Sequence, residues 1–149
     1  MRSNKIRRVP DGQIFSYPGP GADSHPRPLR VLIADDERDT VASLEALLQD
    51  EGHHTCCVFH GRDVISRMAE FAPDVVLLDI GMPGMTGYDV ARELRRRYGS
   101  ATPVLIAVTA WGKSADRLMA KAAGIHHHFG KPYDPQELLR LIASIGAGP

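Results

Sequence analysis

Five side chains suited to phosphate or metal chemistry stand just after apolar runs of the sequence. They are three carboxylates, a hydroxyl and an ammonium: Asp35, Asp36, Asp79, Thr109 and Lys131. Three carboxylates in one place cannot all stay ionised unless positive charge lies beside them. A lysine supplies one such charge, and Mg²⁺, which prefers oxygen ligands, supplies more. These residue types indicate phosphoryl or metal chemistry, provided that the fold brings them together.

Asp79 ends the apolar run VVLLD, and a Pro/Gly-rich segment, IGMPGMTG, follows it. Beside a bound cation, a projecting carboxylate can attack a phosphoryl group and become an aspartyl phosphate. Lys131 can pair with the added negative charge, and Thr109 can donate a hydrogen bond to a phosphoryl oxygen. A single carboxylate at a strand end is ordinarily a solvated surface acid, so this interpretation depends on the whole set meeting.

Apolar runs and helical periodicities alternate from residue 29 onward, which predicts five strands that are each followed by a helix. We predict strands at 29–34, 53–59, 74–78, 103–108 and 126–130. We predict helices at 38–51, 63–71, 88–98, 114–123 and 135–145. Strands that are apolar throughout are typical of a parallel sheet with helices on both faces. We therefore expect an α/β fold, a doubly wound (βα)5 sandwich.

Sheets of this kind carry their functional sites outside the carboxyl ends of the strands. The acidic pair Asp35-Asp36 follows the first predicted strand, and Asp79 follows the third. Thr109 follows the fourth predicted strand, and Lys131 follows the fifth. The predicted fold therefore collects all five side chains at one edge of the sheet.

Taken together, these motifs resemble a response-regulator receiver domain of two-component signalling. The resemblance rests on four motifs in this order: the pair Asp35-Asp36, the segment LLDIGMPGMTG, the pair Thr109-Ala110 and the pair Lys131-Pro132. It covers about residues 29–146 and implies the flavodoxin-like strand order 2-1-3-4-5. Residues 1–28, which are rich in Pro and Gly, are expected to form a disordered or linker-like arm. Residues 147–149 are expected to be a short tail.

The resemblance also implies a role for each acidic residue. Asp79 resembles the phospho-acceptor and is one of the residues around the metal. Asp36 resembles a direct Mg²⁺ ligand, with Asp35 assisting through a water molecule. The backbone carbonyl of Gly81 resembles the third protein ligand. Mg²⁺ is the cofactor that this set implies.

Thr109 and Lys131 resemble the phosphate-sensing pair of the family. The family's switch position, three residues before the lysine, is commonly Tyr or Phe, but here it is His128. A pH-sensitive switch at His128 is a hypothesis, since imidazole titrates near neutral pH. Trp111 and Gly81 occupy positions at which the family varies its side chains and thereby tunes the lifetime of the phosphoryl group.

The implied function is a phosphorylation switch rather than an enzyme, because the domain assists only its own phosphorylation and dephosphorylation. A histidine kinase or phosphotransfer protein would donate the phosphoryl group to Asp79. The surface formed by residues 114–123, 126–130 and 135–145 would then bind a downstream protein, and a homodimer formed on phosphorylation is a further alternative. The rival interpretation is a pseudo-receiver, a protein-binding module that is never phosphorylated.

Two enzyme classes fit the residues less well. A dinucleotide-binding domain needs a glycine-rich turn after its first strand. This chain places Asp35-Asp36-Glu37 there, and three acids would repel a pyrophosphate. A phosphotransferase of the haloacid-dehalogenase type also uses an aspartyl nucleophile, but it needs a second aspartate where this chain has Gly81.

The composition limits the remaining classes. A chain of 149 residues with 43% hydrophobic and 24% charged residues is typical of one soluble domain with a tail. No apolar run approaches the roughly 20 residues of a membrane helix. Cys56 and Cys57 are adjacent and would point to opposite faces of a strand, so an ordinary disulfide between them is not expected, which favours the cytoplasm. Residues 1–29 have a net charge of +3 and the remainder −3, a pattern without the basic footprint of a nucleic-acid-binding protein.

Overall fold

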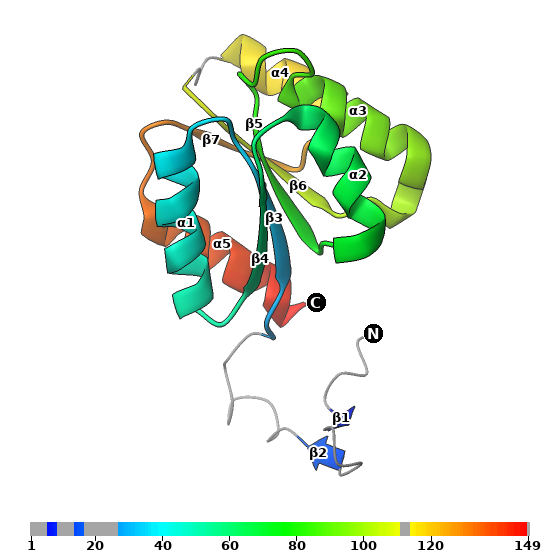
Figure 1. Cartoon of the computed structure of the whole chain (residues 1–149), viewed down its shortest axis with the longest axis vertical. Coiled ribbons are helices and arrows are strands. Elements are labelled where there is room, and N and C mark those ends of the chain that lie inside the picture. The colour runs from blue at the N-terminus through cyan, green and yellow to red at the C-terminus, as the bar shows by residue number, and fades with distance from the viewer. Residues whose placement is uncertain (1–5, 9–13, 17–26, 111–113, 149) are drawn as a thin grey trace.

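The central feature of the protein, in a computed structural model that describes residues 6–8, 14–16, 27–110 and 114–148, is a five-stranded parallel sheet (Figure 1). Its strands are β3 (Arg30–Ala34), β4 (His54–Val58), β5 (Val75–Asp79), β6 (Val104–Thr109) and β7 (His127–Gly130). Their spatial order is β4-β3-β5-β6-β7. When these five strands are numbered along the chain, this is the order 2-1-3-4-5, so the predicted topology is confirmed.

Helices cover both faces of the sheet. They are α1 (Arg38–Asp50), α2 (Gly61–Phe71), α3 (Gly87–Tyr98), α4 (Ser114–Ala122) and α5 (Pro135–Ala147), with a 3-10 turn at Gly99–Ala101 after α3. In Figure 1, α1 and α5 lie on one face of the sheet, while α2, α3 and α4 lie on the other. Each observed boundary lies within two residues of the predicted one.

Alternation along the strands builds a separate apolar core on each face of the sheet. Leu32, Val76 and Leu105 pack toward the helices α2 and α3, in the first core. Leu77 and Ile106 pack toward α1 and α5, in the second core. Because both faces of the central strands are buried, these strands are apolar throughout rather than alternating with polar residues.

Asp79 and Thr109 are the last paired residues of their strands, although the sequence predicted that each would come just after one. Asp79 pairs with Val108 across the β5–β6 ladder, and Thr109 pairs with Gly130 across the β6–β7 ladder. Backbone pairing does not require an apolar side chain, so the ladder continues one residue past each apolar run. Both side chains are therefore held by a rigid strand end.

Two glycines allow the loop after β5 to pack closely against the rest of the domain, because neither has a Cβ atom. A Cβ atom at Gly61 would lie 2.4 Å from the backbone oxygen of Met85, and one at Gly87 would lie 2.9 Å from that of Asp79. Thr86 then starts α3 with a capping box. These contacts fix the backbone that leaves Asp79.

Part of the predicted N-terminal arm is described. Its strands β1 (Ile6–Arg8) and β2 (Ile14–Ser16) pair antiparallel with each other. Residues 1–5, 9–13 and 17–26 lie outside the described residues, so the interpretation of residues 1–28 as a whole stays a prediction. At the other end, α5 extends one residue into the predicted tail.

The two cysteines behave as the strand pattern predicted. Cys56 packs against the core under α2 and α3, and Cys57 packs against the core under α1 and α5. Both thiols are free. Within the described ranges, no helix has the length and apolar character needed to cross a membrane.

Candidate functional site

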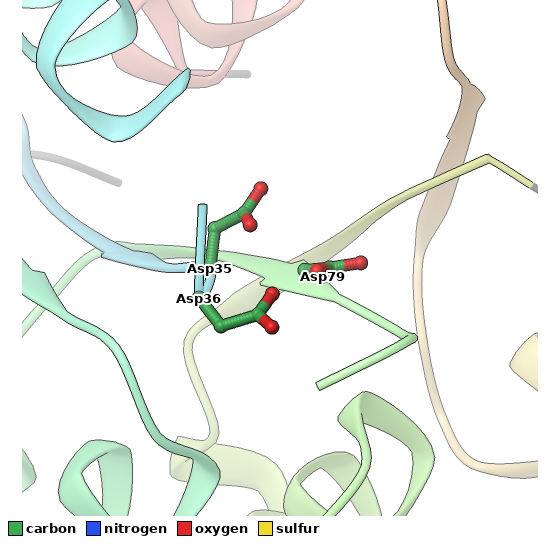
Figure 2. Close-up of side chains that lie close together, drawn as sticks. All are labelled: Asp35, Asp36 and Asp79. Carbon is green, nitrogen blue, oxygen red and sulfur yellow. The ribbon is translucent and has the colours of Figure 1, made fainter. Parts of the chain in front are cut away.

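Three carboxylates meet at the carboxyl edge of the sheet, as Figure 2 shows. Asp35 and Asp36 directly follow β3, and Asp79 ends β5. One oxygen from each of the three side chains lies within 4.8 Å of the other two. The strands β3 and β5 are parallel neighbours, so their ends are held side by side. The three acids that the sequence proposed as a metal-binding set therefore lie together.

A lysine that directly follows the edge strand β7 joins this cluster. The Nζ atom of Lys131 donates a hydrogen bond to Oδ2 of Asp35, at 3.0 Å. The backbone of Lys131 donates to the carbonyl oxygen of Thr109 at 2.6 Å, and the Lys131–Pro132 peptide bond is cis. Burial alone would lower the pKa of Lys131. The hydrogen bond and charge of Asp35, together with the charge of Asp79, outweigh burial and raise this pKa above its usual value. Lys131 therefore stays cationic.

The charge at Asp79 is only partly compensated. Burial raises the pKa of its carboxyl group, and the charge of Asp35 raises it further. A hydrogen bond from the backbone N–H of Gly81 to Oδ1, at 3.0 Å, and the charge of Lys131 act in the opposite direction. The net pKa is about 6. The cluster therefore carries more negative charge than Lys131 alone balances.

Thr109 lies on β6, the strand next to that of Asp79, and His128 lies on β7, one strand further along the sheet. Thr109, at the end of β6, is only 2% exposed. His128 is half-buried on β7 and lies opposite Ala107, two residues before the end of β6. Thr109 therefore lies at the carboxyl edge of the sheet, while His128 lies two residue positions further from that edge, along the neighbouring strand. Trp111 lies outside the described residues.

Two further residues support the cluster, and the sequence analysis missed both of them. The backbone N–H of Glu37 donates to Oδ1 of Asp35 at 2.9 Å. Tyr133 lines a small cavity of about 10 Å³ together with Asp35 and Asp79. Burial raises the pKa of the Tyr133 phenol, so the phenol stays neutral. Glu37 contributes its backbone N–H, a role that its residue type does not reveal in the sequence. For Tyr133, the only indication in the sequence is its position two residues after Lys131.

The donor set fits a hard divalent cation such as Mg²⁺, which binds carboxylate and carbonyl oxygens. Asp35 is already bonded to Lys131 and to the Glu37 amide. Asp36 is exposed, and Asp79 is half-buried, so these two carboxylates are the more accessible ones. The negative charge that Lys131 does not balance would attract a divalent cation to these oxygens.

Comparison with known proteins identifies the family. The family model described as response regulator receiver domain matches residues 31–143. The chain belongs to this family. The resemblance drawn from the sequence motifs is therefore confirmed, while the roles of the individual site residues stay predictions.

Proteins similar to this receiver domain include PilH, a putative response regulator and a chemotaxis protein. The protein PilH of Pseudomonas aeruginosa is 36% identical over 120 residues, which are 80% of this chain and 98% of PilH. A putative response regulator from Chloroflexus aurantiacus has a TM-score of 0.75 at 26% identity and covers 81% of this chain and 99% of its own. The chemotaxis protein CheY4 of Vibrio cholerae shares the fold, with a TM-score of 0.74 at 24% identity, over 80% of this chain and 99% of its own.

Proposed function

We propose that this receiver domain accepts a phosphoryl group on Asp79 from the phosphohistidine of a histidine kinase or phosphotransfer protein. The observation that carries the proposal is the placement of Asp79 at a rigid strand end, within 4.8 Å of oxygens of Asp35 and Asp36. Lys131, bonded to Asp35 at 3.0 Å, adds the cation that a bound phosphoryl group needs nearby. Membership of the receiver family supports the same conclusion.

Asp36, Asp79 and the backbone carbonyl of Gly81 would hold Mg²⁺, with Asp35 assisting through a water molecule. When bound, Mg²⁺ neutralises the charge of the carboxylates and of the phosphoryl oxygens. Gly81 suits this role because it is exposed and leaves the site open. A Cβ atom there would meet only Oδ1 of Asp79, at 3.7 Å.

The chain's own residues orient the reaction. The Gly81 amide holds Oδ1 of Asp79, which leaves Oδ2 to attack the phosphorus. As the new O–P bond forms, the P–N bond of the donor phosphohistidine breaks, and its imidazole leaves with the electron pair and takes up a proton. Lys131 then balances the charge of the new aspartyl phosphate, and the hydroxyl of Thr109 donates to a phosphoryl oxygen.

Phosphorylation acts as a switch because it changes the charge at the sheet edge. Thr109 moves toward the phosphoryl group, and His128 turns inward in the switched state. This shifts the population of conformations on the surface of α4, β7 and α5, where a downstream protein binds. The protein is a cytoplasmic signalling phosphoprotein rather than an enzyme, since its chemistry is confined to its own carboxylate.

The experiment that tests the proposal is reaction with acetyl phosphate, with and without Mg²⁺, followed by intact mass measurement. We expect wild type to gain one phosphoryl group only when Mg²⁺ is present. Asp79→Asn should gain none, and Asp63→Asn on α2 should behave as wild type, because Asp63 lies outside the cluster. A folded wild type that never gains the group would instead make the chain a pseudo-receiver.

A further inference from the structure

A pocket of about 500 Å³ opens between α4 and the edge strand β7. Its lining consists of an ammonium, three imidazoles and two apolar side chains: Lys121, His126, His127, His128, Ala120 and Ile125. None of these described lining residues is acidic, so the pocket offers hydrogen-bond donors and positive charge without a carboxylate that would balance them. Such a lining attracts an anionic group.

The guanidinium of Arg95, in the last turn of α3, lies against the ring of His126 at this pocket. Its Nη2 atom is 3.0 Å from Nε2 of His126 and donates a hydrogen bond to the carbonyl oxygen of Gly124 at 2.9 Å. The other two arginines of this turn pair with Glu93, whereas no carboxylate of the described residues pairs with Arg95. The charge of Arg95 therefore lies beside the pocket and is not neutralised by an acid in the part of the chain that the structure describes.

Hydrogen bonding determines which nitrogen of the His126 ring carries the proton. The backbone N–H of Leu105, a buried residue, donates to Nδ1 at 3.0 Å, so the proton of the neutral ring lies on Nε2. The opposite tautomer would leave this strand N–H without its acceptor, which is costly for a buried group. The Nε2–H of His126 therefore faces Nη2 of Arg95, and two donors meet at 3.0 Å. An oxygen anion that accepts from both of them would satisfy the pair.

The surroundings of His126 keep its ring neutral. Partial burial lowers the pKa of the ring, and the charges of Arg95 and His127 lower it further. The charged and titratable groups around the ring are the guanidinium of Arg95 from α3, the ammonium of Lys121 from α4 and the other two imidazoles of the pocket, while β6 contributes the N–H of Leu105. The cations among these groups disfavour an imidazolium. The donor pair is therefore present without protonation of the ring.

We propose that the pocket binds a carboxylate of an acidic segment of a downstream protein, which accepts hydrogen bonds from Nε2 of His126 and Nη2 of Arg95. A carboxylate suits this pair because its oxygens accept several charge-assisted hydrogen bonds at once. Lys121 adds a positive charge, and Leu118, one turn before it on α4, is 70% exposed and offers an apolar contact. The occupant is therefore a segment that combines acidic and apolar residues. Its identity as a downstream protein rests on the proposed function, which places partner binding at α4, β7 and α5.

The test is an NMR titration of the full-length, unphosphorylated chain with a blocked peptide in which two leucines are flanked on each side by two glutamates. At about pH 7.5 and about 50 mM salt, we expect saturable shifts of the amide signals of Lys121, His126 and His127, with a dissociation constant of about a millimolar. The matched peptide with glutamine in place of glutamate should bind at least about tenfold more weakly, because it lacks the charges. A proton–nitrogen correlation spectrum of the imidazoles should place the proton of the free His126 ring on Nε2.

Two variants test the donors, and a third is the matched control. His126→Asn keeps an acceptor for the N–H of Leu105 but loses the Nε2 donor, and it should weaken binding of the glutamate peptide by about tenfold. Lys121→Glu reverses an exposed charge and should weaken binding by a similar factor, about tenfold. Arg67→Glu, on α2 beside the opposite edge strand β4, changes the net charge equally and should bind as wild type.

Several results would overturn the proposal. They include equal binding of the two peptides, wild-type affinity of His126→Asn or Lys121→Glu, a ring proton on Nδ1, and no saturable shift up to about 20 mM peptide. Stronger binding of inorganic phosphate than of the glutamate peptide would assign the pocket to a phosphate group instead. Shifts that appear when the protein concentration alone is raised would assign it to a second copy, which also overturns the proposal. Every measurement uses the unphosphorylated protein, so these outcomes are independent of whether Asp79 accepts a phosphoryl group.

Discussion

Removing the charge of Asp79 should stabilise the protein at neutral pH when no divalent cation is present. The folded state raises the pKa of this carboxyl from 3.8 to about 6, chiefly through burial, with Asp35 adding to the effect. Between these two pH values the folded state binds a proton that the unfolded state has already lost. Stability is therefore highest at low pH for this group and falls as the pH rises to about 6.

The size of the effect follows from the same two pKa values. The difference between 3.8 and about 6 corresponds to an upper limit of roughly 3 kcal/mol. Because Asp79 is only half-buried, solvent screening lowers this figure, and we expect Asp79→Asn to raise the free energy of unfolding by about 1–2 kcal/mol at pH 7.5. The amide is nearly isosteric and its oxygen can still accept the hydrogen bond from Gly81, so packing should not change.

The assay is urea unfolding of wild type and Asp79→Asn in buffer with a chelator, from pH 5 to pH 8. The stability gain of Asp79→Asn should be large at pH 7.5 and should shrink toward pH 5. Asp63→Asn, on α2 and away from the cluster, is the matched control and should show no such trend. Millimolar Mg²⁺ should stabilise wild type more than Asp79→Asn, because a cation that binds the folded state stabilises it.

Two results would refute this reasoning. If Asp79→Asn is less stable than wild type at pH 7.5, the ionised carboxylate is favourable in its site and Lys131 outweighs the burial and the acidic neighbour. If the gain is the same at pH 5 and pH 8, it does not come from titration of Asp79. Either result would remove the electrostatic argument for a cation at this edge of the sheet.

Three further predictions rest on single contacts. In urea unfolding, Gly87→Ala should lower the free energy of unfolding by about 1–3 kcal/mol, because the new Cβ would lie 2.9 Å from backbone atoms. The control Gly81→Ala should change it by less than about 0.5 kcal/mol. Equal effects of the two substitutions would contradict the packing described for the loop. Lys131→Met removes the cation near Asp79, so an NMR titration should find the pKa of that carboxyl above about 6, and an unchanged value would contradict the role given to Lys131. Burial lowers the pKa of His53, so stability should fall as the pH drops below 6.5, and His53→Gln should lose less stability between pH 7 and pH 5 than wild type; equal losses would show that His53 does not titrate in this way.

The fold could be predicted from the sequence because its strands are buried on both faces. The run Val75–Leu78 is apolar at every position, which is typical of a central strand of a covered sheet. Once the strands were known, parallel pairing placed Asp35, Asp36 and Asp79 at one edge. This part of the site needed no information beyond residue type and position along the chain.

The remaining features depend on contacts between distant segments, which the local pattern does not encode. The helix α2 begins at Gly61, two residues before the predicted start, and the Met85 backbone approaches this glycine closely from a distant segment. The Glu37 amide and the Tyr133 ring join the cluster through backbone direction and loop geometry rather than through a motif. The same holds for two histidine contacts: His53 accepts a hydrogen bond from the backbone N–H of Leu29, just before β3, and His126 accepts one from that of Leu105, the second residue of β6.

The most direct test of the central claim is to locate the phosphoryl group on the chain. Wild type treated with acetyl phosphate and Mg²⁺ would be reduced with borohydride, which converts an aspartyl phosphate to homoserine, and then mapped by peptide mass spectrometry. We predict homoserine at position 79 in wild type, at no other aspartate, and at no position when Mg²⁺ is omitted. Homoserine at position 35 or 36, or a phosphoryl group gained by Asp79→Asn, would contradict the assignment of Asp79 as the acceptor.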